Sequence, residues 1–189
     1  MRSLCLTACL AVSMAHAQTD WTLASGYSPS SFQTQNILAF ASDVQALSQG
    51  SLRINVQAGG SLIKLPDIPQ AVKEGKVAAG ETILINLVAD MPIAGADAIP
   101  FVVKGYDDAR RLWDLQKPLV ETEFARRGLK VLYAVPWPPQ GLYARMALKT
   151  PADLKGLGMR TYNQTTTRIA EKLGARPVSA AMADVSQAF

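Results

Sequence analysis

The chain has 189 residues, and its 19 Lys and Arg against 15 Asp and Glu give a net charge of +4. This length is enough for one medium domain or two small ones with a buried core. The basic residues are scattered, with doublets only at 110–111 and 126–127. This pattern is typical of a solvated surface and argues against nucleic acid as a partner.

Residues 1–17 are typical of a secretory signal peptide. Arg2 precedes an apolar stretch from Leu4 to Met14, and residues 15–17 (AHA) form an A-x-A cleavage site. We expect cleavage after Ala17 and export of the remaining chain. The only histidine and both cysteines lie in this leader. Residues 18–189 therefore cannot supply a disulfide, a thiol or imidazole nucleophile, or a His/Cys zinc site, and we expect no metal or cofactor.

Strands and helices alternate along the rest of the chain, which predicts an α/β fold with a mostly parallel sheet. Pro118 should kink the longest helix, in which Leu119 and Val120 face inward. The predicted elements up to the first proline-rich stretch are a strand at 21–25, a helix over 37–47, a strand at 51–57, a helix at 67–74, a strand region over 77–88, a helix over 107–127 and a strand at 129–135.

A stiff crossover follows, because the prolines at 136, 138 and 139 cannot donate hydrogen bonds to a ladder. Beyond it we expect a strand at 142–148, one helical turn at 151–155, a strand at 157–162, a helix ended by Gly174, a strand at 177–179 and a helix beginning at Ala183. These patterns predict a first α/β lobe over 18–137 and a second over 138–189. Because the sequence stops inside an amphipathic turn, we expect the second lobe to be truncated.

Several ordered motifs resemble one family of binding proteins. They are LSQGSLRINVQAGGSL (47–62), AVKEGKVAAGE (71–81), IPFVV (99–103), TPADLKGLGMRTYN (150–163) and EKLGARPV (171–178). Together they resemble the dicarboxylate-receptor type of solute-binding protein from tripartite ATP-independent periplasmic (TRAP) transporters. The resemblance implies a two-lobed venus-flytrap fold, of which the first lobe and only the start of the second are present. It also implies capture of an organic acid and its delivery to membrane permease subunits.

Arg160 matches the family arginine that binds the substrate carboxylate. A guanidinium suits this task because its planar fork donates two parallel hydrogen bonds to one carboxylate and stays charged. On residue type alone, an ordinary surface arginine is the expected interpretation, because arginines are usually exposed. Relatives tend to have lysine where this chain has Gly158, which should loosen the strand and leave the arginine in place.

Five further residues are candidate ligand contacts. Trp137 could stack on a ligand or pack against the hinge prolines, and Gln140 beside it could supply an amide. Asn163 could reach the ligand or cap the following helix. Glu81 interrupts an apolar run, so it is paired or faces a cavity, where it must meet a hydroxyl, an amine or Arg160. Tyr27 follows the first strand and is the remaining candidate.

Three functions stay open from the residues alone. The first is a periplasmic receptor for an organic acid. The second is a secreted hydrolase or lyase, which would have to work without His or Cys and which lacks a G-x-S-x-G motif. The third is a fragment that binds nothing.

Overall fold

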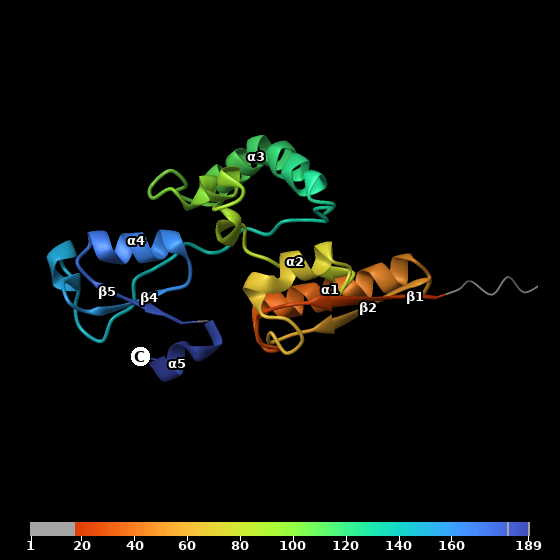
Figure 1. Ribbon diagram of the computed structural model, residues 1–189, viewed down its shortest axis with the longest axis horizontal. Coiled ribbons are helices and arrows are strands. Elements are labelled where there is room, and N and C mark those ends of the chain that lie inside the picture. The colour runs from red at the N-terminus through yellow and green to blue at the C-terminus, as the bar shows by residue number, and fades with distance from the viewer. Residues whose placement is uncertain (1–17, 181, 189) are drawn as a thin grey trace, which may run out of the picture.

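The computed structural model describes residues 18–180 and 182–188, so the predicted signal peptide lies outside the described residues. The chain forms two parallel sheets at opposite ends of the molecule, with a long helix apart from both (Figure 1). The first sheet contains β1 (Thr19–Ala24), β2 (Leu52–Gln57) and β3 (Ala79–Gly80) in the order β2-β1-β3. The second pairs β4 (Gly158–Thr161) with β5 (Arg176–Ser179). The mixed α/β fold is thus the one that the alternating pattern predicts.

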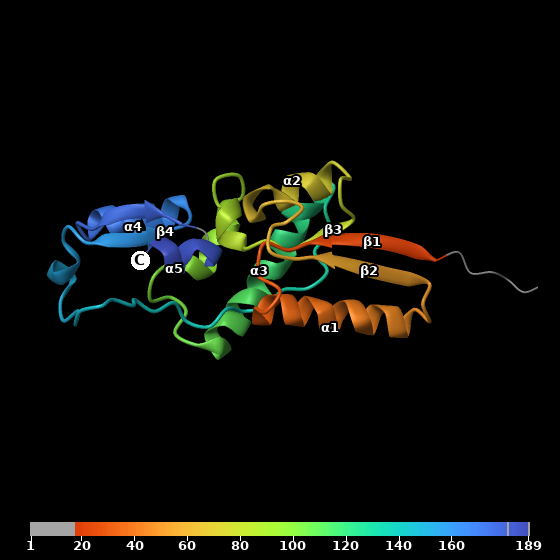
Figure 2. The same cartoon turned by 90° about the horizontal axis from the view of Figure 1, so that it is seen from below.

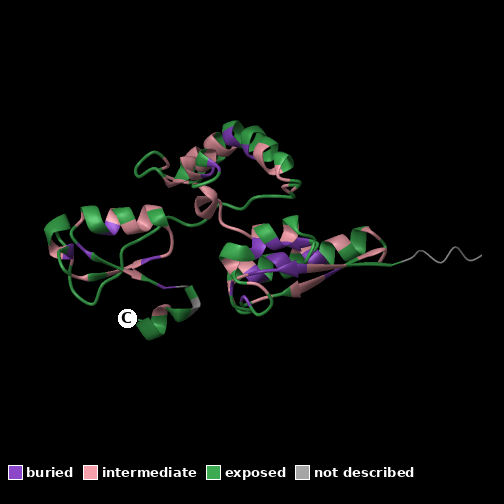
Figure 3. Cartoon of the chain, viewed as in Figure 1, coloured by how far each residue is buried: buried purple, intermediate pink, exposed green. Residues whose placement is uncertain are grey.

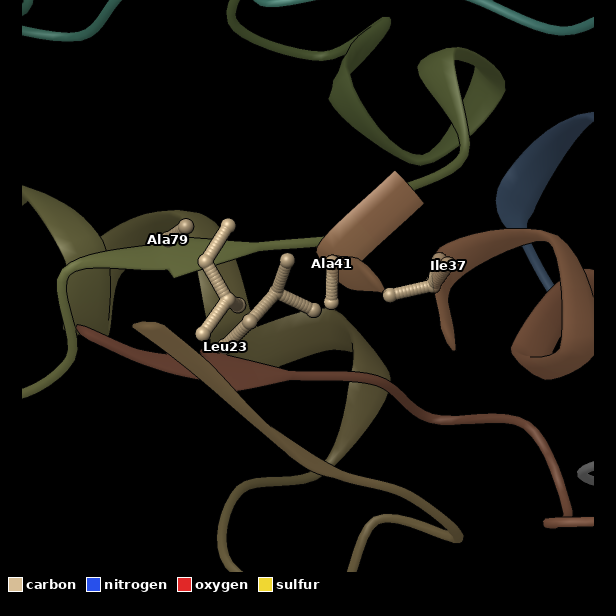
Figure 4. Close-up of a cluster of buried hydrophobic side chains, with 5 residues drawn as sticks. Leu23, Ile37, Ala41 and Ala79 are labelled. Atoms are coloured by element: carbon tan, nitrogen blue, oxygen red, sulfur yellow. The ribbon is translucent and has the colours of Figure 1, made fainter. Parts of the chain in front are cut away.

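Helices cover both faces of the first sheet, α1 (Phe32–Leu47) on one side and α2 (Ile68–Lys73) on the other (Figure 2). Successive side chains of a strand point to opposite faces. Leu23 accordingly packs with Ile37 and Ala41 of α1 (Figure 4), while the adjacent Ala24 packs with Ile68 of α2. The first sheet is therefore buried on both faces, as a parallel sheet requires.

Local signals set the ends of α1. Ser31 is its N-cap, and its side-chain oxygen accepts a hydrogen bond from the backbone N–H of Thr34 at 3.3 Å. At the other end, the chain leaves the helix through Gln49 and Gly50, both at positive φ. The predicted stop at Gly50 is confirmed.

The longest helix, α3 (Tyr106–Arg126), runs through Pro118 without a break. Gln116 is buried and its amide donates to the carbonyl of Ile93, which ties α3 to the 3₁₀ turns over Pro92–Ala98. Val120 is fully buried, as predicted, but Leu119 is exposed. Leu119 does not face inward as predicted, because the rest of the protein covers a narrower strip of α3 than its apolar residues occupy.

The second sheet is a small β-α-β unit. One helical turn (Pro151–Leu154) precedes β4, and α4 (Gln164–Lys172) connects β4 to β5. Gly174 ends this helix at positive φ. The last described element is α5 (Val185–Ala188), preceded by a 3₁₀ turn. These elements agree with the predicted order.

Two predicted strands are wrong, and a third is much shorter than expected. The region 77–88 contains only the two-residue β3, followed by a 3₁₀ turn over Leu84–Leu87, and residues 129–135 and 142–148 form neither helix nor strand. A strand needs a neighbouring backbone with which to form a ladder, and no described strand lies beside these segments.

Burial is uneven along the chain. Buried residues concentrate in the first sheet and its two helices, whereas most of the segment after α3 is exposed (Figure 3). None of the helices in the described ranges is sufficiently long and apolar to cross a membrane.

Candidate functional site

Arg160 is held in place by the backbone of the second sheet. It lies in β4 opposite Val178 of β5, and its Nε donates a hydrogen bond of 3.0 Å to the carbonyl of Ala180. Its guanidinium carbon lies 4.7 Å from the centre of the Tyr162 ring. These two contacts fix the plane of the guanidinium while the side chain stays half-buried.

The two terminal nitrogens of Arg160 remain available. Neither has a hydrogen-bond or ion-pair partner anywhere in ranges 18–180 and 182–188. A half-buried guanidinium without an anion is costly, because its charge is only partly solvated. The arrangement therefore offers a prepared fork to one carboxylate.

Asn163 caps the helix that follows β4. Its Oδ1 accepts a hydrogen bond of 2.9 Å from the backbone N–H of Thr166, and the Thr166 hydroxyl completes a capping box. The capping alternative is confirmed. The Nδ2 group of Asn163 is buried and has no partner in the described part of the chain. The amide donor is thus left over after the oxygen has capped the helix.

Tyr27 and Trp137 form an aromatic wall against the first sheet. Tyr27 is buried, and its ring centre lies 5.5 Å from that of Trp137, which also contacts Phe32 at 5.9 Å. The carbonyl of Tyr27 accepts a hydrogen bond from the Thr34 hydroxyl, which ties it to α1. Trp137 therefore packs against Tyr27, which follows β1, and against Phe32 at the start of α1.

Glu81 lies at the carboxyl end of β3. Its backbone N–H donates to the carbonyl of Ala24 at 2.9 Å, and its carboxylate accepts a hydrogen bond of 2.7 Å from the Ser25 hydroxyl. No Lys or Arg of the described residues pairs with it. Burial raises the pKa of Glu81, and the Ser25 hydrogen bond lowers it only partly. This carboxylate is the one that the sequence predicts to be paired or to face a cavity.

The pKa of the Tyr27 hydroxyl is raised. Burial raises its pKa most, the charges of Glu81 and Tyr162 raise it further, and the charge of Arg160 lowers it. The charge on this hydroxyl is thus influenced by groups of both sheets. Glu81 and Tyr27 come from the end of the first sheet, and Arg160 comes from the second. Ligands of open parallel sheets bind at the carboxyl ends of the strands.

Of the six predicted residues, Tyr27 and Trp137 are in ring contact, and Glu81 and Arg160 carry charges that shift the pKa of Tyr27. Asn163 follows Arg160 by three residues, and its hydrogen bonds in the described part of the chain are to Thr166 and Thr167. Gln140 is exposed, and no hydrogen bond of the described residues joins its side chain to this group.

The sequence analysis misses Tyr162 and Ser25. Both leave a signal in the sequence. Tyr162 directly follows β4 and stands two residues after Arg160, the spacing at which side chains of extended backbone point to the same side. Ser25 is a polar residue directly after an apolar strand. No group of three or more His, Cys, Asp or Glu residues that could hold a metal ion occurs in the portion of the chain the structure covers. The chemistry of the site is that of a cation, a hydrogen-bonded carboxylate and aromatic rings.

Comparisons with known proteins show the family and the fold of the chain. Residues 23–189 match the family of bacterial extracellular solute-binding proteins, family 7 (DctP). The DctP6 receptor of Bordetella pertussis, an extracytoplasmic solute receptor binding pyroglutamic acid, is 38% identical with a TM-score of 0.86, over 90% of this chain and 56% of that one. The DctP7 receptor of the same organism, also binding pyroglutamic acid, is 33% identical with a TM-score of 0.87, over 90% and 57%.

A third solved structure comes from an unidentified microbe in a marine metagenome. It is a TRAP solute-binding protein specific for pyroglutamate, 34% identical with a TM-score of 0.86, over 91% of this chain and 57% of that one. This chain thus spans little more than half the length of these solved structures. The fold is that of the TRAP periplasmic binding proteins, and the chain belongs to family 7 of the bacterial extracellular solute-binding proteins, the DctP family.

Proposed function

We propose that this protein is a periplasmic receptor that captures a small organic acid through the carboxylate and delivers it to the membrane permease of a TRAP transporter. The observation that carries the proposal is the Arg160 fork, which is anchored at Nε and whose two terminal nitrogens have no hydrogen-bond or ion-pair partner among the described residues. The similar receptors that bind pyroglutamate support that compound, or a close analogue, as the ligand. Residues 18–189 contain no His or Cys, which weighs against the hydrolase or lyase alternative.

In the proposed complex, each terminal nitrogen of Arg160 donates to one oxygen of the ligand carboxylate. The Tyr27 and Trp137 rings supply an apolar wall, and the buried amide of Asn163 supplies a further donor. Residues 136–139 lie between the two sheets and are the proposed hinge between lobes, the first over 18–137 and the second over 138–189. Binding would then favour a closed arrangement of the two lobes, because only that arrangement gives the ligand contacts on both sides.

The test is isothermal titration calorimetry with pyroglutamate on the product of the full reading frame that encodes this chain. Arg160→Ala should weaken binding about 10- to 150-fold for each hydrogen bond lost, since a bond to a charged group contributes roughly 1.5–3 kcal/mol. Arg160→Lys should recover little, because an ammonium lacks the fork.

The matched control is Arg168→Ala, which removes an exposed arginine from α4 in the same half of the molecule. Its affinity should equal that of the parent. An Arg160→Ala variant that binds as tightly as the parent would rule out this mode of recognition.

A further inference from the structure

We propose that Tyr162 is a positioning residue, whose ring holds the Arg160 guanidinium in the orientation that presents both terminal nitrogens to one carboxylate. This inference rests on the proposed function, because it concerns how the same arginine binds its ligand. It adds a residue that raises the affinity for the ligand by acting only through Arg160.

The backbone places the Tyr162 ring beside Arg160. Arg160 lies in β4, and Tyr162 directly follows this strand. Side chains two residues apart in extended backbone point to the same side. The backbone N–H of Tyr162 donates a hydrogen bond of 3.1 Å to the hydroxyl of Thr166, which belongs to the capping box of α4. The start of α4 therefore holds the backbone from which the Tyr162 ring projects.

The two contacts of the Arg160 side chain restrict different motions. Its Nε donates a hydrogen bond of 3.0 Å to the carbonyl of Ala180, and the N–H of Ala180 donates in turn to the carbonyl of Thr161 at 3.1 Å. The hydrogen bond from Nε alone leaves the guanidinium free to turn about the axis of that bond. The Tyr162 ring, whose centre lies 4.7 Å from the guanidinium carbon, covers one side of the group and so limits this rotation.

The ring of Tyr162, and not its hydroxyl, makes the contact that holds Arg160. The hydroxyl has no hydrogen-bond partner within residues 18–180 and 182–188. Both side chains are half-buried, and the attraction between a cation and an aromatic ring grows as water is removed. A phenylalanine should therefore replace Tyr162 in this role, whereas an aliphatic side chain of similar size should not.

A fixed guanidinium raises affinity because two parallel hydrogen bonds to one carboxylate require the two groups to share a plane. A mobile arginine loses conformational freedom when a ligand orders it, and that loss weakens binding. An arginine that the protein already holds loses little. Removing the Tyr162 ring should therefore raise the Kd about 2- to 13-fold, the cost of ordering one long side chain.

The experiment is calorimetry with pyroglutamate on the product of the full reading frame that encodes this chain. Tyr162→Leu should bind more weakly than the parent by that factor, and Tyr162→Phe should restore the parent's affinity. The matched control is Tyr143→Leu, which removes an exposed tyrosine from the same half of the chain and should leave the Kd unchanged.

A double-mutant cycle tests whether Tyr162 acts through Arg160. In an Arg160→Ala background, Tyr162→Leu should cause no further loss of affinity, because the group that the ring positions is absent. Ligand-observed NMR titrations can measure the weak dissociation constants of these two variants. Equal losses in both backgrounds would show that the ring contacts the ligand itself, and would overturn the inference.

NMR spectra of the parent without ligand provide a readout that needs no change at Tyr162. Protons that lie over an aromatic ring resonate upfield of their ordinary positions, so side-chain signals of Arg160 should be shifted upfield. Their absence from the spectrum of Arg160→Ala identifies them. Signals at ordinary positions would overturn the inference even where Tyr162→Leu does not fold.

The outcomes separate this inference from the proposed function. A Tyr162→Leu variant that binds pyroglutamate as tightly as the parent overturns the inference and leaves the receptor function standing. A parent that does not bind pyroglutamate contradicts the proposed function, and the inference falls with it.

Discussion

Gly26 lies where a methyl group has no room, between the end of β1 and the buried Tyr27. A Cβ atom added at Gly26 would lie 2.5 Å from Leu65 Cβ, 3.1 Å from Leu65 Cδ1 and 3.2 Å from Leu65 Cα. Two of these three atoms, Cα and Cβ of Leu65, cannot be moved away by a change of side-chain rotamer. Gly26→Ala must therefore displace the 3₁₀ turn over Leu65–Asp67 relative to the sheet.

The expected cost follows from this displacement. Leu65 Cβ must retreat by about half an ångström to reach 3.0 Å, the lower limit of real Cβ contacts. Overpacking of this kind costs roughly 1–3 kcal/mol of the free energy of unfolding. In a chain of this length each kcal/mol lowers the melting temperature by about 2–4 °C. Thermal melts followed by circular dichroism should therefore show Gly26→Ala melting about 2–12 °C below the parent.

Two further variants make the reasoning testable. Gly105→Ala is the matched control, because an added Cβ there meets nothing within 4 Å and the backbone is extended. It should change stability by less than about 1 kcal/mol. Adding Leu65→Ala to Gly26→Ala should not restore stability, since Cβ and Cα of residue 65 remain. A Gly26→Ala protein as stable as the Gly105→Ala control would refute the argument from this contact.

Two more stability predictions concern Glu81 and Pro118. Burial raises the pKa of Glu81 above its ordinary value of 4.5, so the folded state binds this proton more tightly than the unfolded state, and stability should fall as pH rises from 4.5 through the folded-state pKa. In thermal melts at a series of pH values, Glu81→Gln should melt above the parent at neutral pH and the difference should shrink toward pH 4.5; a difference independent of pH would contradict this. Pro118 is exposed inside α3 and withholds one helical N–H, so Pro118→Ala should raise the free energy of unfolding in urea by about 1–3 kcal/mol, and a lower value would show that the proline shapes the helix.

The sequence predicts those elements whose signals are local. The helix over Phe32–Leu47 has apolar residues at helical spacing, a capping serine and a glycine stop, and each of these acts within a few residues. The unit from β4 to β5 is equally readable, since Asn163 and Gly174 mark both ends of its helix. Here residue type alone decides the backbone conformation.

The strand predictions for 129–135 and 142–148 are wrong because a strand also depends on signals outside its own segment. Their apolar composition suits a strand, but a strand exists only when another backbone lies at hydrogen-bonding distance, and the sequence of the segment carries no information on that neighbour. In the structure the ring of Tyr133, in the first of these segments, instead packs against Phe40. Trp137, two residues beyond that segment, packs against Tyr27 and Phe32. The aromatic character is used, but for contact with α1 and its preceding turn.

The site shows the same division. Residue type identifies Arg160 and Glu81, because an arginine in a recognised motif and a carboxylate in an apolar run are unusual. Their effect on the pKa of Tyr27 depends on how the two halves of the chain are arranged in space, and no spacing in the sequence gives that. The boundary of the lobes at residue 137 and the roles of the six candidate residues remain predictions.

The order β2-β1-β3 has a consequence for the N-terminal side of the fold. The middle strand of the first sheet is supplied by residues 19–24, the first element that the structure describes. Proteolysis at a chain terminus usually removes poorly ordered residues whose loss leaves the fold intact. Here the loss of six residues would remove both ladders of the sheet at once and separate α1 from α2, so the permissible site for a fusion partner or a protease lies before Thr19 and not within the strand.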